Sequence, residues 1–331
     1  MNAKKVLLLS SCDVRALLAI DECTAAVEHA FRLHGEGKTI PPAVVGLHVA
    51  SGGFHIKAGV LSLSKNYFAA KVNANFPDNQ TNFALPTIQG IIILCDADNG
   101  MPLALVDSRD ITALRTAAAT AVAAKYLARP DSRMVTVCGC GTQGRTQLAA
   151  IARMFPLEAV FAYDKNPQQS SDFARELRAA LNIPITATDD LADCIRNCDI
   201  CITCTTSHEP FVSEADVRPG VFIAAVGADN PHKHEIDMAV MARSKIVCDV
   251  IEQCATMGDL HHALNAGVVK MEDVHAELGK IVASRKPGRE SAEEVIVFDS
   301  TGMALQDVAA TALVYEKAVR QQAGTLLQLA A

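Results

Sequence analysis

The stretch Val135-Thr-Val-Cys-Gly-Cys-Gly-Thr-Gln-Gly144 decides the fold. An apolar run ends in the pattern Gly139-x-Gly141-x-x-Gly144, a helical pattern follows, and a second apolar run ends on Asp164. In this order of parts the first glycine permits a tight turn, the second lets the backbone approach a pyrophosphate, and the third lets helix and strand pack closely. The helix N-terminus would hold the phosphates, and Asp164 would accept hydrogen bonds from ribose hydroxyls. We therefore predict a dinucleotide site; the alternative is a glycine turn in an ordinary α/β unit.

The sequence on either side of this stretch predicts the fold class. From about residue 133 to 300, short apolar runs alternate with helical patterns, which is typical of a parallel sheet with helices on both faces. The earlier part is richer in strands, and a final helical pattern at 303–322 is expected to return to it. We expect an α/β protein with a Rossmann-type doubly wound parallel sheet over residues 126–303. A second, α+β domain for substrate binding and dimerisation would comprise residues 1–125 and 304–331.

Composition excludes several classes of protein. The chain of 331 residues is 50% hydrophobic and 20% charged, which is typical of a globular protein with a sizeable core. Its net charge of −7, with acids and bases interspersed, argues against nucleic acid as a partner. Since no uninterrupted apolar run reaches the length of a membrane span, we expect a cytoplasmic protein without a membrane partner. The apolar run after Met1 is short and is interpreted as a first strand rather than a signal peptide.

The cysteines and histidines predict no metal site. The eleven cysteines are interpreted as thiols in a reducing compartment, most of them buried in core strands. Cys198, Cys201 and Cys204 form a CxxCxxC pattern, but on a strand this spacing sends the side chains to alternating faces. The histidines lack the paired ligand spacing of a zinc site.

Isolated charged residues in apolar segments of the sequence are the candidate catalytic residues. Lys71 is a lone cation on a probable strand and should face a cleft or a counter-charge, so a structural ion pair is the alternative. Arg115, without a charged neighbour in its alanine-rich helix, could bind a carboxylate or a phosphate. Asp229 follows an apolar strand, where ligands of open α/β sheets bind, and could donate or accept a proton, or merely cap a turn.

Three further candidates are weaker. His55 and Lys57 lie two residues apart on a strand, so both point the same way and could line a cleft. Lys233 could pair with Asp229 or reach a phosphate. Ser300, in Asp299-Ser-Thr-Gly302, could contact the nicotinamide end of a cofactor or belong to the N-cap of the last helix.

Several of these segments together resemble the ornithine cyclodeaminase/μ-crystallin family. The matching segments cover nearly the whole chain in order: Leu85-Pro-Thr-Ile-Gln-Gly90, Ile111-Thr-Ala-Leu-Arg-Thr-Ala-Ala118, Gly139-Cys-Gly-Thr-Gln143, Val226-Gly-Ala-Asp229 and Val297-Phe-Asp-Ser-Thr-Gly302. Asp273-Val-His-Ala-Glu-Leu-Gly279 and Gly288-Arg-Glu-Ser291 are most similar to the ketimine reductase and alanine dehydrogenase branch.

The resemblance implies a nicotinamide cofactor, a homodimer built on the first domain, and a site between the domains. It assigns Lys71, Arg115 and Asp229 to the substrate and catalytic positions. The positions that it implies around the cofactor are Thr87, Arg115, Thr142, Gln143, Asp164, Thr205, Ile223, Ala224, Ala225, Val226, Lys233 and Ser300. Asp164 favours NAD(H) over NADP(H), although the adjacent Lys165 could soften that preference.

Two departures from the family pattern bear on the substrate. A basic residue that helps to hold the substrate carboxylate usually follows the Pro41-Pro42 pair, but here that residue is Ala43, and Lys57 is a hypothetical substitute. His55 stands where the cyclodeaminase branch tends to have a glutamate, which argues against ornithine cyclisation.

The leading hypothesis is an oxidoreductase that transfers hydride to the C=N bond of a small cyclic imino acid, such as 1-pyrroline-2-carboxylate, to give proline. The alternatives are an alanine dehydrogenase, an ornithine cyclodeaminase that recycles its NAD, and a ligand-binding protein of the μ-crystallin type.

Overall fold

The computed structural model describes residues 5–328 and divides into two compact units. The first unit comprises the chain up to Ala118 together with the chain from Met303, and the second unit comprises Ala119–Gly302. The division falls after Ala118, within the helix α4 (Ser108–Leu127), whereas the sequence predicted it later in the same helix, after residue 125. The helix runs through the division without a break, so the local sequence carries no signal of it.

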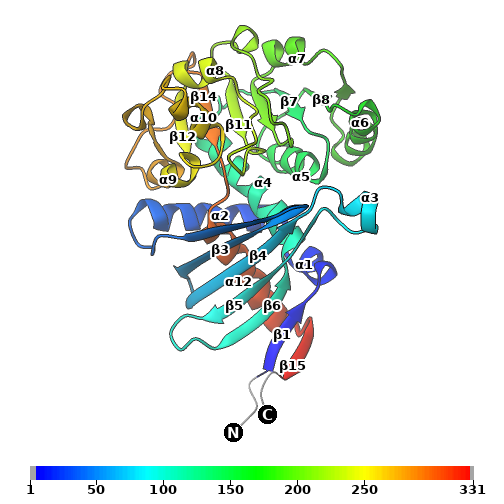
Figure 1. Ribbon diagram of the computed structural model, residues 1–331, viewed down its shortest axis with the longest axis vertical. Coiled ribbons are helices and arrows are strands. Elements are labelled where there is room, and N and C mark those ends of the chain that lie inside the picture. The colour runs from blue at the N-terminus through cyan, green and yellow to red at the C-terminus, as the bar shows by residue number, and fades with distance from the viewer. Residues whose placement is uncertain (1–4, 329–331) are drawn as a thin grey trace. The chain divides into compact units, whose positions relative to one another are not determined.

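The second unit holds an eight-stranded parallel sheet in the order β13-β12-β14-β11-β10-β7-β8-β9 (Figure 1). Its strands are β7 (Met134–Cys138), β8 (Ala159–Tyr163), β9 (Ile185–Ala187), β10 (Ile200–Thr203), β11 (Phe222–Ala225), β12 (Lys245–Cys248), β13 (Ala276–Glu277) and β14 (Ile296–Asp299). From β7 the chain proceeds outward to β8 and β9. From β10 it proceeds to the other side, where β14 lies between β11 and β12, so the order reverses between β7 and β10. This is the doubly wound topology that the sequence predicted, and ligands bind at its reversal point.

The helices of the second unit begin and end at residues with clear local reasons. Asn166 caps α6 by accepting from the backbone N–H of Gln168, and Asn182 ends it in the left-handed conformation. The helix α8 begins at Met238, because Asp237 caps it and Ile236 pairs with Val212 in a β-bridge. The helices are α5 (Thr142–Ile151), α6 (Pro167–Leu181), α7 (Leu191–Asn197), α8 (Met238–Arg243), α9 (Ile251–Cys254), α10 (Asp259–Asn265) and α11 (Leu278–Val282), with short 3-10 turns at Glu214–Asp216 and Met271–Asp273.

The first unit holds a seven-stranded mixed sheet in the order β15-β1-β6-β5-β4-β3-β2. Its strands are β1 (Lys5–Leu9), β2 (Ala43–Val49), β3 (Gly52–Ser62), β4 (Asn66–Asn75), β5 (Ile88–Asp96), β6 (Pro102–Asp107) and β15 (Thr325–Gln328). Only β1 and β6 pair in parallel among these described strands. The sequence did not predict β15, which pairs with β1 and brings the two ends of the described chain together.

Helices cover one face of this sheet, and none of the helices in residues 5–328 covers the other. The unit's helices are α1 (Ser11–Leu17), α2 (Ile20–Gly35), α3 (Asn79–Phe83), α12 (Ala304–Gln321) and the first part of α4. Figure 1 shows α12 crossing one face, and a Cβ on Gly59 would come within 2.9 Å of Leu305 of that helix. The opposite face, called here the open face, carries exposed apolar side chains: Val45, Leu47, Val49, Phe54, Val72 and Ile91.

Two further expectations concern cysteines and membranes. Cys138, Cys140, Cys201 and Cys248 are buried as predicted, whereas Cys204 is half-buried. Within residues 5–328, none of the helices combines the length and the apolar character that a bilayer crossing requires.

Candidate functional site

The first unit buries a cluster of cations beneath α12. Lys71 on β4 is 2% exposed, and its Nζ lies 2.8 Å from Oδ1 of Asp307 and 3.4 Å from Oγ1 of Thr112. Arg115 on α4 forms an ion pair with the same Asp307 oxygen, at 3.0 Å from Nε, and its Nη1 donates to Oε1 of Gln306 at 2.8 Å. Lys71 and Arg115 therefore share one carboxylate oxygen. Because one carboxylate cannot neutralise two cations, the buried cluster keeps a net positive charge.

The counter-charge comes from α12, which the sequence analysis did not connect with Lys71. Asp307 is the one acid in the apolar first turns of that helix, so the reasoning that singled out Lys71 and Arg115 also applies to it. Burial opposes its ionisation, but the charges of Arg115 and Lys71 prevail and lower the pKa of Asp307. Its Oδ2 and Nε2 of Gln306 have no hydrogen-bond partner among the described residues. The cluster therefore keeps buried polar atoms to which a polar ligand could bind.

Lys57 and His55 lie on the neighbouring strand β3. Lys57 is buried and stands directly opposite Lys71 in the antiparallel pair. Burial and the nearby charge of Arg115 lower the pKa of Lys71 to about 7, despite the opposing effect of Asp307. His55 is half-buried and its ring lies 6.1 Å from that of His48, in an edge-on arrangement. The structure thus brings Lys71, Arg115 and Lys57 together, as predicted for a carboxylate-binding group.

The glycine loop of the second unit has the geometry that a pyrophosphate requires. Gly139 adopts a φ of +100°, and a Cβ on Gly144 would overlap the carbonyl oxygen of Gly139. A Cβ on Gly141 would instead meet no described atom within 4 Å, so the backbone is open to a ligand there. Gly141 is the N-cap of α5, and no described side chain caps the free N–H groups that follow it. Gln143 Oε1 is buried and, within residues 5–328, has no partner.

Asp164 lies against this loop at the end of β8. Its Oδ2 accepts from the backbone N–H of Cys140 at 2.8 Å, and its Oδ1 accepts from that of Asn166 at 2.9 Å. The carboxylate is therefore fixed beside the glycine loop, where the sequence predicted an acid for the ribose.

The ends of β10, β11 and β14 carry the other predicted cofactor residues of this unit. Ile223, Ala224 and Ala225 are buried within β11, and Val226 follows them. Thr205 donates to Glu235, a fully buried acid that the sequence analysis missed. Ser300 donates to Oδ2 of Asp249 at 3.1 Å, and the backbone N–H of Gly302 donates to the same oxygen at 2.6 Å. Ser300 precedes the N-cap of α12, which is Met303.

Asp229 and Lys233 form an ion pair beyond the end of β11. Lys233 Nζ lies 2.7 Å from Oδ1 of Asp229, whose side chain is 48% exposed. The acid is thus accessible to a ligand, and its ammonium partner stabilises the ionised form. Thr87, the remaining predicted residue, lies in the first unit on the exposed segment before β5, where its carbonyl accepts from Phe76.

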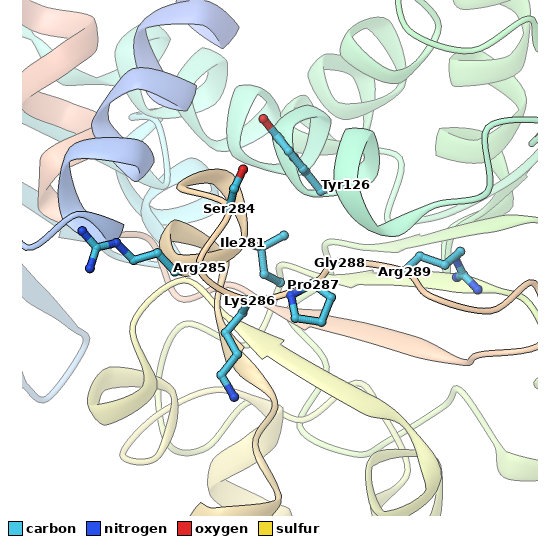
Figure 2. A pocket seen from close by; sticks show the side chains of 8 residues that line it. All are labelled: Tyr126, Ile281, Ser284, Arg285, Lys286, Pro287, Gly288 and Arg289. Carbon is cyan, nitrogen blue, oxygen red and sulfur yellow. The ribbon is translucent and has the colours of Figure 1, made fainter.

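A cavity of about 440 Å³ in the second unit lies elsewhere (Figure 2). Its lining includes Tyr126 and Arg289, and Arg289 donates to the carbonyls of Leu127 and Val221, which precede β7 and β11. This is the amino edge of the sheet, whereas ligands of such sheets bind at the carboxyl edge. Figure 2 shows Arg285, Lys286 and Arg289 extending in different directions, so their charges do not converge on an anion. We do not assign the cavity to the functional site.

The described residues also contain no group of three or more His, Cys, Asp or Glu side chains arranged to hold a metal ion.

Comparison with known proteins identifies the family. The ornithine cyclodeaminase/mu-crystallin family matches residues 4–322. The chain belongs to this family. The resemblance recognised in the sequence is therefore confirmed.

Three solved structures are similar to the chain over almost its whole length. An archaeal alanine dehydrogenase dimer with bound NAD is 37% identical, with a TM-score of 0.95 over 99% of this chain and 100% of that chain. The Δ1-pyrroline-2-carboxylate reductase of Thermococcus litoralis, in complex with NADH and L-proline, is 34% identical, with a TM-score of 0.91 over 97% and 99%. The iminosuccinate reductase of Paracoccus denitrificans, in complex with NAD+, is 30% identical, with a TM-score of 0.90 over 98% and 100%.

Proposed function

We propose that this protein is an NAD(H)-dependent reductase that converts a small cyclic imino acid, of the 1-pyrroline-2-carboxylate type, into the amino acid. The observation that carries the proposal is the buried cluster in which Lys71 and Arg115 share one oxygen of Asp307. The positive charge that this sharing leaves over would be satisfied by a substrate carboxylate. The three similar proteins are described with NAD or NADH, and their named substrates and products are amino or imino acids, which supports the proposal.

The residues of the second unit fit a dinucleotide. The open backbone at Gly141 and the uncapped N–H groups at the start of α5 would receive the pyrophosphate, and Asp164 would receive the adenosine ribose. The negative charge of Asp164 favours NAD(H), with NADP(H) as the weaker alternative. Bound there, the reduced cofactor would supply the hydride.

The protein's own residues would bind the substrate and move one proton. Arg115 and Lys71, with Lys57 as the substitute for the basic residue missing at Ala43, would hold the carboxylate and orient the C=N bond. Asp229 would deliver the proton to the nitrogen or, as the carboxylate with which Lys233 pairs, balance the positive charge of an iminium substrate. One hydride on carbon and one proton on nitrogen complete the reduction of the imine to an amine.

Oxidative deamination of alanine is the second candidate reaction, because an alanine dehydrogenase is among the similar structures. It uses the same groups, with water added to an open-chain imine. Ornithine cyclisation and ligand binding without turnover rank lower. His55 stands where the cyclodeaminases of the family tend to have a glutamate, which argues against cyclisation.

We also propose a cytoplasmic homodimer that assembles through the open face. The dimeric alanine dehydrogenase supports this, and so do the exposed apolar side chains of that face, since monomers rarely leave large apolar patches in water. The eleven cysteines, all of them free thiols, fit a reducing compartment.

The test is a substrate panel with both reduced cofactors. We expect NADH oxidation with 1-pyrroline-2-carboxylate, and slower turnover with pyruvate plus ammonia. Ammonia release from ornithine without net NADH consumption would instead identify a cyclodeaminase. Tight nucleotide binding without turnover of any imino or amino acid would contradict the proposed activity and favour a binding protein.

A further inference from the structure

One buried carboxylate joins the ends of two neighbouring strands in the second unit. Glu235 Oε1 accepts from the backbone N–H of Thr205 at 2.6 Å and from its hydroxyl at 2.7 Å. Glu235 Oε2 accepts from the hydroxyl of Thr203 at 2.7 Å and from the backbone N–H of Gly227 at 2.9 Å. Thr203 and Thr205 lie at the end of β10, and Gly227 lies just beyond β11. A single side chain thus fixes the carboxyl ends of both strands.

The neighbouring residues are adapted to this arrangement. A Cβ on Gly227 would overlap the Glu235 carboxylate, so only glycine allows the backbone to approach it there. Thr205 Oγ1, while donating to Glu235, also accepts from the backbone N–H of Ser207 at 3.1 Å, which extends the fixed segment along the loop. Glu235 itself is held by Asp259, whose Oδ1 accepts from its backbone N–H at 2.8 Å.

Each oxygen of the Glu235 side chain accepts from a backbone N–H, that of Thr205 on Oε1 and that of Gly227 on Oε2, so both positions must be occupied by acceptors. The side-chain amide of a glutamine would turn an N–H toward the Thr203 hydroxyl and the Gly227 N–H. The hydroxyl can rotate to accept it, but the backbone N–H cannot. One buried donor would then lose its partner, which is costly away from water.

These strand ends belong to the half of the fold that receives the nicotinamide. In a doubly wound sheet the dinucleotide lies across the reversal point, with one mononucleotide on each side. Asp164 assigns the adenosine half to the β7–β8 side. The nicotinamide half then falls on the side of β10 and β11.

We propose that Glu235 is a positioning residue for the nicotinamide half of the cofactor, and this inference rests on the proposed NAD(H)-dependent function. Glu235 touches neither substrate nor cofactor. It acts through Thr205 and the loop that begins at Gly227, which it holds in place before the cofactor binds.

The test compares two nucleotides on the full-length protein carrying Glu235→Gln. NADH has both halves of the dinucleotide, whereas ADP-ribose lacks the nicotinamide. We expect the Kd for NADH to rise roughly tenfold, the cost of one unsatisfied buried donor, while the Kd for ADP-ribose stays within about twofold. At saturating NADH the KM for the imino acid should change little, because the carboxylate-binding cluster lies in the first unit, whereas kcat should fall because the loop that Glu235 holds carries Asp229.

Asp199 offers a matched control. It is also a buried acid with several donors, among them the backbone N–H groups of Arg133 and Met134, but it precedes β10 at the amino edge of the same sheet. Asp199→Asn should lower the melting temperature without changing the ratio of the NADH and ADP-ribose affinities.

The outcomes separate the possible failures. If wild-type protein does not bind NADH, the proposed function itself is wrong. If Glu235→Gln weakens the binding of NADH and of ADP-ribose equally, or weakens the binding of neither, the positioning role is wrong while the proposed function stands. Should Glu235→Gln not fold, Thr203→Val removes one hydrogen bond to the carboxylate and keeps the acid. That variant should raise the Kd for NADH about threefold and leave the Kd for ADP-ribose unchanged. Equal changes in both Kd values would overturn the inference.

Discussion

Lys71 combines two properties that rarely coexist, since it is almost completely buried and yet carries an ion-pairing ammonium. Its exposed fraction is 2%, and its counter-charge, Asp307, is shared with Arg115. The sequence predicted that a lone lysine in apolar text must face a counter-charge or a ligand. It could not identify Asp307 as the partner, because the two residues are 236 positions apart and only the packing of α12 on the sheet joins them.

The titration of Lys71 gives the first prediction. Its pKa is lowered to about 7 by burial, so raising the pH through 7 removes one of the positive charges that would hold the substrate carboxylate. We expect kcat/KM for the imino acid to fall by up to about tenfold per pH unit above that value, measured from pH 6 to 9. Lys71→Gln should lower kcat/KM roughly 10- to 100-fold and remove the decline. A decline that persists in this variant would mean that another group titrates.

Asp164 gives the second prediction, on cofactor preference. Its charge would repel the 2′-phosphate of NADPH, so Asp164→Ser and Asp164→Asn should both raise the NADPH/NADH ratio of kcat/KM, by roughly tenfold. Asparagine is the sharper variant because its amide oxygen can still accept from Cys140 or Asn166, which isolates the charge. An unchanged ratio in both variants would show that the assignment of this acid to the ribose is wrong.

At the scale of elements, periodicity predicted the long helices and central strands well. Their patterns are strong because each buries a continuous face or run of apolar side chains. The short edge strands β9, β13 and β15 were not predicted. They have two to four residues, too few for alternation to appear, and they form only because a longer strand lies beside them.

The third prediction concerns the turn between β7 and α5, where two glycines have different roles. Gly144→Ala should lower the melting temperature by roughly 3–10 °C, because its Cβ would overlap the carbonyl of Gly139. Gly141→Ala should leave the melting temperature unchanged, since its φ of −77° suits alanine and no described atom lies near the added Cβ. It should instead raise the Kd for NADH at least tenfold, because the added methyl group would occupy the space of the pyrophosphate. Fluorescence titration measures this Kd. Full NADH affinity in Gly141→Ala would argue that the phosphates bind elsewhere.

At the scale of the whole molecule, the open face of the first unit exposes apolar side chains to water, and assembly into a dimer would explain this exposure. The family resemblance predicted a dimer built on the first domain. It could not identify the face, because whether an apolar strand face is covered depends on where helices from distant parts of the chain pack.

The fourth prediction follows from this face. Leu47 is 55% exposed and stands opposite Phe54 of the neighbouring strand β3, so Leu47→Glu should place a charge in the proposed interface and shift the protein to monomers. Sedimentation velocity at micromolar concentration measures the change. Val268→Glu is the control, because Val268 is 47% exposed in the second unit and should not affect assembly. A dimer that survives Leu47→Glu would exclude the open face as the interface.

The construction of the first unit from both ends of the chain bears on how the protein is made. Residues 119–302 are contiguous and can collapse around their own sheet as soon as they leave the ribosome, whereas the earlier strands must wait for α12 and β15. Until α12 arrives, Lys71 and Arg115 lack the carboxylate that neutralises them. The cluster that would bind the acid is thus completed only by residues that follow the nucleotide-binding unit, and a nascent chain stopped at residue 302 would carry a nucleotide fold with an unfinished neighbour.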